Sequence, residues 1–181
     1  MKKNIIIRNS TEDDISAIQA IYDYEVKFGL ATFDETARPF EAHFNKRVEV
    51  LELGLPHLVA EIDGKVIGYS YAVKYRQERS GYRYCLENSV FIDKDYQRKG
   101  VGSLLMDKLI EGCEKGPWRQ MIAVIGDSEN YGSIGLHAKF GFRKVGTFYA
   151  AAFKLGRWVD SVLMQRELGA GDRSLPDDHH S

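Results

Sequence analysis

The sequence contains little cysteine and has no excess of charge of either sign. Cys85 and Cys113 are its only cysteines, which excludes a disulfide scaffold and a zinc site with four cysteine ligands. With 25 Lys and Arg against 26 Asp and Glu, the formal net charge is -1, so nothing points to nucleic acid or an anionic membrane as a partner. No apolar run could span a bilayer, and the start has only three consecutive apolar residues, Ile5–Ile7, too few for a secretory signal. We therefore expect a cytoplasmic protein with two reduced thiols and no nucleic-acid, membrane or metal partner.

What the chain does contain is enough apolar sequence for one domain. Hydrophobic residues make up 44% and charged residues 28% of its 181 residues, a globular balance. Only the end of the chain, residues 169–181, lacks residues to bury, and its two histidines have no partner ligand nearby. We predict a single domain over residues 1–168 and a disordered tail over 169–181.

The pattern of apolar residues and turn signals predicts the order β-α-α-β-β-β-α-β-α-β-β. Ser10 and Thr11, followed by Asp13 and Asp14, predict a helix start, and Asp63-Gly64 predicts a tight hairpin. The expected strands are 5–8, 58–62, 65–74, 86–92, 121–125, 145–153 and 158–164, and the expected helices are 15–29, 39–54, 101–113 and 134–140. This mixture predicts an α+β fold around one mixed sheet.

One turn has the composition of a phosphate site. The string Gln97-Arg98-Lys99-Gly100-Val101-Gly102 joins the strand at 86–92 to the following helix. The first amides of a helix have no internal acceptor and lie at the positive end of its dipole, so they attract anions. The Gly-Lys-Ser/Thr of a Walker motif is absent, and Leu105 stands where a Rossmann fingerprint needs a third glycine. The other interpretation is a tight turn with solvated basic residues.

That string resembles the Gln/Arg-x-x-Gly-x-Gly/Ala signature of the GNAT superfamily of N-acetyltransferases. Asn130 to Phe142 is similar to its second conserved block, Asn-x-x-Ser/Ala…Leu-Tyr/His-x-x-x-Gly-Phe, and the predicted order of elements is also that of the superfamily. The resemblance covers about residues 5–168. It implies the GNAT fold, in which one mixed, mostly antiparallel sheet is flanked by helices and acetyl-CoA binds where two strands splay.

Three further strings resemble the phosphinothricin and methionine sulfoximine acetyltransferases. They are Ala31-Thr32-Phe33, the run 75–87 (YRQERSGYRYCLE) and the run 153–160 (FKLGRWVD). The resemblance to this branch implies a small amino acid as substrate, a detoxifying role and a homodimer.

The resemblance also implies the residues that bind acetyl-CoA. A β-bulge would free the Val90 N–H toward the thioester oxygen, and the turn would hold the pyrophosphate. Asn130 would bind the pantetheine amides, cap its helix, or do both. The implied acetyl-CoA-binding residues are Ser89, Val90, Phe91, Ile92, Gln97, Arg98, Lys99, Gly100, Val101, Gly102, Ser103, Asn130 and Ser133.

Two residues are candidates for acid–base catalysis. Glu87 is our candidate base for the acceptor amine, because the resembling enzymes have a glutamate there and neighbouring Cys85 and Leu86 would raise its pKa. The alternative is an outward-facing charge. His137 stands where many members place a tyrosine that protonates the leaving thiolate, but a lone histidine at helical spacing is also typical of a core. We keep both interpretations of His137.

The acceptor pocket is predicted from a local cluster of charge. Lys74, Arg76, Arg79 and Arg83 against Glu78 give 4 − 1 = +3 within ten residues, which is either a solvated loop or a site for a carboxylate. By resemblance, Arg76, Arg79, Tyr82 and Glu87 would bind substrate, Phe33 would cover its apolar part, and Lys154 would close the pocket from its own or a second subunit.

These observations predict an acetyl-CoA-dependent enzyme that acetylates the α-amine of a small amino acid. Methionine sulfoximine, methionine sulfone and phosphinothricin are the expected acceptors, with direct transfer in a ternary complex. One alternative keeps acetyl-CoA but uses a polyamine, an aminoglycoside or a protein amine. The other is a non-catalytic CoA-binding module.

Overall fold

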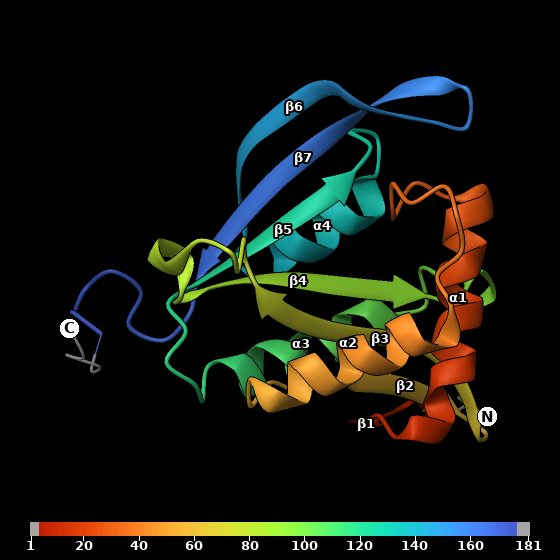
Figure 1. The fold of residues 1–181 in the computed structure, drawn as a ribbon, viewed down its shortest axis with the longest axis horizontal. Coiled ribbons are helices and arrows are strands. Elements are labelled where there is room, and N and C mark those ends of the chain that lie inside the picture. Colours follow the sequence, from red (N-terminus) through yellow and green to blue (C-terminus); the bar gives the residue numbers. More distant parts are fainter. Residues whose placement is uncertain (1–3, 177–181) are drawn as a thin grey trace.

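The computed structural model describes residues 4–176 of the chain. Seven strands form one sheet in the order β1-β2-β3-β4-β5-β7-β6 (Figure 1). The strands are β1 (Ile6–Asn9), β2 (Leu58–Ile62), β3 (Lys65–Lys74), β4 (Cys85–Ile92), β5 (Gln120–Gly126), β6 (Arg143–Lys154) and β7 (Arg157–Glu167). The helices are α1 (Ile15–Phe28), α2 (Phe40–Glu52), α3 (Val101–Cys113) and α4 (Tyr131–Lys139), with 3-10 turns η1 (Glu12–Asp14), η2 (Ser80–Tyr82) and η3 (Lys94–Tyr96).

All neighbouring strands pair antiparallel except β4 and β5, which are parallel. The predicted order of elements and the mixed, mostly antiparallel sheet are confirmed. Two tight turns follow from sequence: Asp63-Gly64 has φ values of 50° and 78°, and Leu155-Gly156 has 51° and 76°. A two-residue hairpin whose central residues both have positive φ matches the natural twist of the strands, and Asp-Gly is a favoured pair.

Helices cover both faces of the sheet. Ile15, Ile18 and Ile21 of α1 recur at helical spacing and pack on one face against Tyr69 and Phe91. On the other face, Leu105, Met106 and Leu109 of α3 are fully buried in a second, larger core. Burying a side chain of this size contributes about 1.5–3 kcal/mol each to folding. The long hairpin of β6 and β7 extends beyond the helices toward the end of α1 (Figure 1).

Strands β4 and β5 separate early, and this separation creates the site. They pair only at Cys85, Leu86 and Glu87, whereas β4 stays paired with β3 from Leu86 to Ile92 without a shift of register. The prediction of a β-bulge on β4 is therefore wrong. The sheet opens because β4 diverges from β5, which leaves the β5-facing edge of residues 88–92 without a strand partner.

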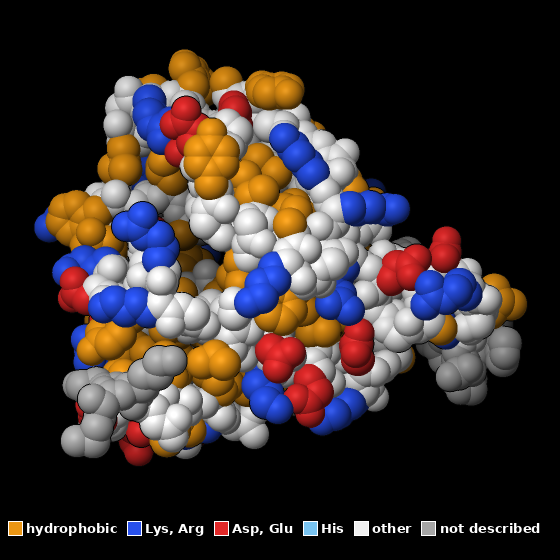
Figure 2. Space-filling model, turned by 180° about the vertical axis from the view of Figure 1, so that it is seen from behind, with side chains coloured by type: hydrophobic (Ala, Val, Ile, Leu, Met, Phe, Trp, Pro, Cys, Tyr) orange, Lys and Arg blue, Asp and Glu red, His pale blue; other side chains and the backbone are white. Residues whose placement is uncertain are grey.

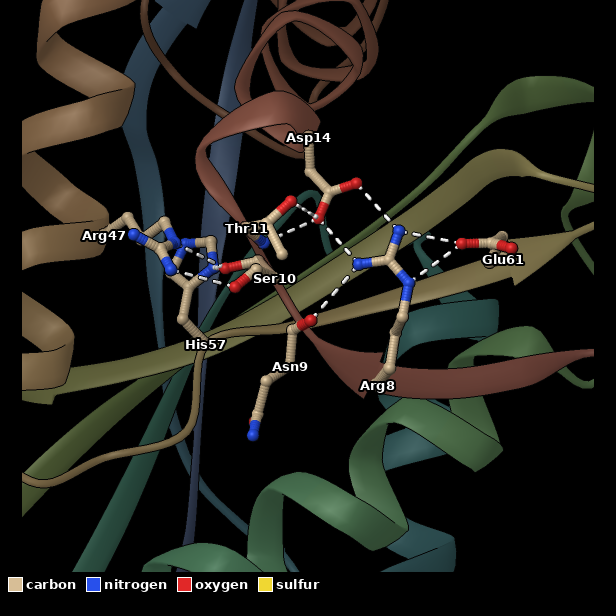
Figure 3. Close-up of polar contacts among 8 residues, drawn as sticks. All are labelled: Arg8, Asn9, Ser10, Thr11, Asp14, Arg47, His57 and Glu61. Carbon is tan, nitrogen blue, oxygen red and sulfur yellow. Dashed lines mark hydrogen bonds and ion pairs between the residues drawn. The ribbon is translucent and has the colours of Figure 1, made fainter.

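A polar network fixes the start of α1, as Figure 3 shows. The Asp14 carboxylate accepts a hydrogen bond from the Thr11 N–H at 2.7 Å, so the predicted capping arrangement is present and uses this pair. Arg8 of β1 donates to Asp14 at 2.7 Å and to Glu61 of β2 at 2.8 Å. One guanidinium thereby links two strands to the first turn of the helix.

The described part of the C-terminal segment is attached to the domain. Arg119 donates hydrogen bonds to Gly171 O, Ser174 Oγ and Leu175 O, and Arg173 donates to Glu167. Residues 169–176 thus differ from the free tail that their composition predicts, and residues 177–181 lie outside the described part. Within residues 4–176, no helix is both long and apolar enough to cross a membrane.

Candidate active site

A cleft of about 1110 Å³ opens where β4 leaves β5. Its walls come from α1 and the loop that follows it, from β4, from the turn before α3, and from the end of β5 with α4. This volume lies slightly above the range of about 300–1,000 Å³ typical of ligand sites. The predicted residues that line it are Phe33, Glu87, Ser89, Val90, Phe91, Ile92, Gln97, Arg98, Gly100, Gly102, Ser103, Asn130, Ser133 and His137.

The backbone of β4 presents alternate residues to this cleft. Tyr75 N–H bonds to Cys85 O at 2.9 Å, and Asp93 N–H bonds to Ile67 O at 2.9 Å. Because the register between them is unbroken and antiparallel bonds alternate, odd-numbered residues of β4 bond to β3. The N–H and C=O of Val90 and Ile92 therefore point away from β3, toward the open edge.

The turn before α3 has the backbone conformation of an anion site. Arg98 and Gly100 both have positive φ, 56° and 85°, and the former is costly for a residue with a Cβ. Such strain clusters at functional turns. The free amides at the start of the 13-residue helix α3 face this turn. Lys99 instead donates to Asp95 O, and Val101 is buried in the core, so neither lines the cleft.

Glu87 lies at the last paired position of β4, beside the opening. Burial raises the pKa of its carboxyl above the usual range, and the nearby Lys46 acts in the opposite direction. A carboxylate with a raised pKa in a cleft has the properties of a general base. Cys85, two residues earlier, is a poor nucleophile, because burial and the Glu87 charge raise the pKa of its thiol to about 11.

His137 is buried, 4% exposed, and both ring nitrogens have partners. Nδ1 lies 2.7 Å from Ser133 O and must donate to it, and Nε2 lies 3.0 Å from the Asn88 side-chain nitrogen and must accept. Burial lowers the pKa of this imidazole, although the Ser133 carbonyl opposes that effect. The ring is therefore neutral and bridges α4 to β4 just beyond the point where β4 and β5 separate.

Asn130 caps α4. Its side-chain oxygen accepts from the Ser133 N–H at 3.1 Å, and its amide nitrogen lies 3.4 Å from Gly126 O. Asn130 and Ser133 also line the cleft. Asn130 can therefore cap α4 and still contact a ligand in the cleft.

Near Glu87 the cleft contains residues that the sequence did not single out. Tyr22, Arg38, Lys46 and Tyr71 line this end together with Phe33. Arg38 lies over the Tyr22 ring and pairs with Asp34, and Lys46 pairs with Glu49. No motif marks these positions, since Lys46 belongs to the polar pattern of an ordinary surface helix and Arg38 to a loop.

Four predicted substrate residues lie outside the cleft of a single chain. Arg76, Arg79 and Tyr82 belong to the exposed β3–β4 loop, where Arg76 and Tyr82 contact the Tyr75 ring. Lys154 is buried in its own chain and bonds to backbone carbonyls, not to the cleft. Within residues 4–176, no group of three or more His, Cys, Asp or Glu side chains could hold a metal ion.

Comparison with known proteins agrees with this geometry. Residues 18–142 match the Acetyltransferase (GNAT) family. Phosphinothricin N-acetyltransferase of Alcaligenes faecalis is 51% identical over 94% of this chain and 86% of its own, and an L-methionine sulfoximine/L-methionine sulfone acetyltransferase of Salmonella typhimurium is 32% identical over 94% and 98%. The crystal structure of a GNAT phosphinothricin acetyltransferase from Sinorhizobium meliloti in complex with acetyl-CoA superposes with a TM-score of 0.92 at 36% identity, covering 97% of this chain and 94% of that one. The chain belongs to the GNAT family of acetyltransferases.

Proposed function

We propose that the protein transfers an acetyl group from acetyl-CoA to the α-amine of a small amino acid such as phosphinothricin, methionine sulfoximine or methionine sulfone. The observation that carries the proposal is the position of Glu87, a half-buried carboxyl at the mouth of the opening between β4 and β5. Relatives with these named activities cover nearly the whole chain, which supports the same chemistry here.

The cleft offers acetyl-CoA a binding site of suitable chemistry. The turn at Gln97–Gly102 and the start of α3 would hold the pyrophosphate, and the open backbone groups of Val90 and Ile92 would bind the pantetheine amides. Bound acetyl-CoA supplies the acetyl group as a thioester. The Val90 N–H, which points toward the open edge, would donate to the thioester oxygen as it gains negative charge.

Glu87 would take the proton of the acceptor ammonium, directly or through water, so that the amine becomes nucleophilic. The amine would then attack the thioester carbon, the C–S bond would break, and the leaving CoA thiolate would take up the proton that the acetylated nitrogen releases. His137 has no free nitrogen and no proton to give without breaking a bond to Asn88 or Ser133. We therefore assign His137 a structural role and reserve the acid–base role for Glu87.

The acceptor end of the cleft favours an anionic substrate. Arg38 and Lys46 line it near Glu87, and a substrate carboxylate would pair with them in exchange for Asp34 and Glu49. Arg76, Arg79 and Tyr82 remain candidates for the acceptor only if they approach from a second subunit, because the cleft of one chain excludes them.

The proposal is tested by measuring CoA thiol release with the three named amino acids, a polyamine, an aminoglycoside and a peptide. Glu87→Gln is expected to lower turnover by about 10²- to 10⁴-fold while acetyl-CoA still binds. Glu129→Gln, at an exposed position outside the cleft, is the matched control and should change little. Thiol release only with the polyamine would refute the amino-acid assignment. Acetyl-CoA binding without release for any amine would favour a non-catalytic module.

We also propose that the protein is a cytoplasmic homodimer whose two copies meet through their β6–β7 hairpins. Its proposed role is detoxification. β6 is an edge strand, and the hairpin exposes Phe148, Tyr149, Phe153, Leu155 and Trp158, each at least half exposed. Hydrophobic side chains are visible along the upper rim in Figure 2, whereas basic ones are dispersed over that face. Sedimentation of Trp158→Ser should show a monomer, and Tyr131→Ser, on α4, should leave the dimer intact.

A further inference from the structure

The loop between α1 and α2 forms the acceptor end of the cleft. Residues Gly29 to Phe33 line it, and Phe33 is the aromatic residue predicted to cover the substrate. The loop contains no helix or strand between Phe28 and Phe40, so its shape depends on contacts with other elements.

Lys154, at the end of β6, holds this loop from outside the cleft. Its side chain is 2% exposed, and its ammonium donates to Glu25 O at 2.9 Å and to Thr32 O at 2.7 Å. The Glu25 carbonyl belongs to the last turn of α1, where the helix dipole favours a cation. The Thr32 carbonyl immediately precedes Phe33. One ammonium thus ties the end of a helix to the residue before the aromatic.

Strand β5 holds the same loop at a second point. At Gly126, an added Cβ would lie 2.0 Å from Leu30 O and 3.1 Å from the Phe33 ring. The loop backbone therefore rests directly on the backbone of β5, and only glycine leaves room for it. Two strands that follow the loop by about a hundred residues fix its position.

We propose that Lys154 is a positioning residue that sets acceptor binding and selectivity through the loop and Phe33, without touching the acceptor. This inference rests on the proposed acetyltransferase activity. It replaces the prediction that Lys154 binds the substrate, because two of its three ammonium hydrogens are directed to backbone carbonyls of its own chain.

The test compares Lys154→Met with Lys144→Met, an exposed lysine on the same strand. For Lys154→Met, kcat/KM for phosphinothricin should fall about 10- to 100-fold, with the dissociation constant of acetyl-CoA within about twofold of wild type. The ratio of kcat/KM between phosphinothricin and methionine sulfone should also change, which a general loss of folded protein would not cause. Amides of residues 30–36 should exchange hydrogen faster in Lys154→Met only.

A second variant keeps the inference testable if Lys154→Met folds poorly. Gly126→Ala displaces the same loop from β5 and should reproduce the loss for the acceptor and the faster exchange in residues 30–36. Equal loss of acetyl-CoA and acceptor binding in Lys154→Met, or unchanged exchange in 30–36 in both variants, would overturn the proposal. If wild type acetylates none of the amino acids, the proposed function fails, and hydrogen exchange still decides whether Lys154 holds the loop.

Discussion

Acid should destabilise this protein through one buried histidine, His57. Its ring is 2% exposed and stacks on Tyr71, with centroids 5.4 Å apart and planes within 4°. Nδ1 lies 2.9 Å from Ser10 Oγ, which itself accepts from Arg47 at 2.9 Å (Figure 3). With one lone pair occupied by Arg47, the serine hydroxyl still has its proton to donate to Nδ1 of a neutral His57 ring. Burial, assisted by the Arg47 charge, lowers the pKa of His57 from 6.5 to about 4.

Because folding lowers the pKa of His57, acid destabilises the folded state. Because the folded state holds the proton less tightly than the unfolded state, the stability from neutral His57 is complete above pH 6.5 and is lost as pH falls toward 4. Linkage gives a loss of about 1 kcal/mol at pH 5.5 and roughly 2–3 kcal/mol at pH 4.5. Against a total stability of about 5–15 kcal/mol, this is a substantial fraction.

The assay is urea unfolding of wild type and His57→Phe at pH 7.5, 5.5 and 4.5. The variant keeps an aromatic ring against Tyr71 but removes the titrating group, so groups that titrate in both proteins cancel in the difference. His57→Phe should be less stable than wild type at pH 7.5 by about 1–3 kcal/mol, because the Ser10 hydroxyl loses its acceptor. That difference should shrink, or reverse, at pH 4.5. Parallel pH dependences for the two proteins would refute the assignment of the acid effect to His57.

Two further predictions concern the opening between β4 and β5. Asn88→Leu removes the hydrogen bond to His137 Nε2 and leaves this buried acceptor without its donor. The free energy of unfolding should therefore fall by about 1–3 kcal/mol, and the affinity for acetyl-CoA should fall with it. Scanning and titration calorimetry measure the two quantities, and an unchanged affinity would count against a bridge across the opening. Gly100→Ala meets no steric contact but forces a Cβ into φ +85°, so it should cost about 1–2 kcal/mol and weaken acetyl-CoA binding. Gly81→Ala, in open space on the exposed β3–β4 loop and outside the cleft, should do neither.

The sequence predicts those parts of the fold that local rules decide. The Asp63-Gly64 hairpin, the turn before α3 and the apolar stripe of α3 are all encoded within a few residues. Glu87 could also be proposed from sequence, because a motif and a strand ending locate it. The alternation of apolar residues in β4 does not predict the point at which β4 and β5 separate. That point depends on pairing with residues more than thirty positions away.

Other site residues carry no local signal. Arg38 and Lys46 look like ordinary surface charges until α2 and the loop before it pack beside β3 and place both residues in the cleft wall. The arginine cluster at 76–83 lies outside the cleft of one chain, because a run of charge shows composition but not the direction in which a loop points. β6 was predicted as a regular strand over 145–153, yet its register shifts between Phe148 and Ala152, where the Asp160 carboxylate accepts from the Ala150 N–H at 2.8 Å.

The alternation of a single strand separates the functions of the site. Side chains of odd-numbered β4 residues lie on the α1 and α2 face, as the contacts of Phe91 with Tyr22 and the effect of Lys46 on Glu87 show. Even-numbered side chains lie on the other face, where Asn88 reaches His137. The even-numbered backbone groups lie between, in the plane of the sheet. The proposed base, Glu87, would therefore meet the acceptor on one face, the Asn88–His137 bridge lies on the other, and the backbone groups proposed to bind the thioester lie between them. A one-residue shift of β4 would exchange all three, which explains why its unbroken register with β3 matters to the chemistry.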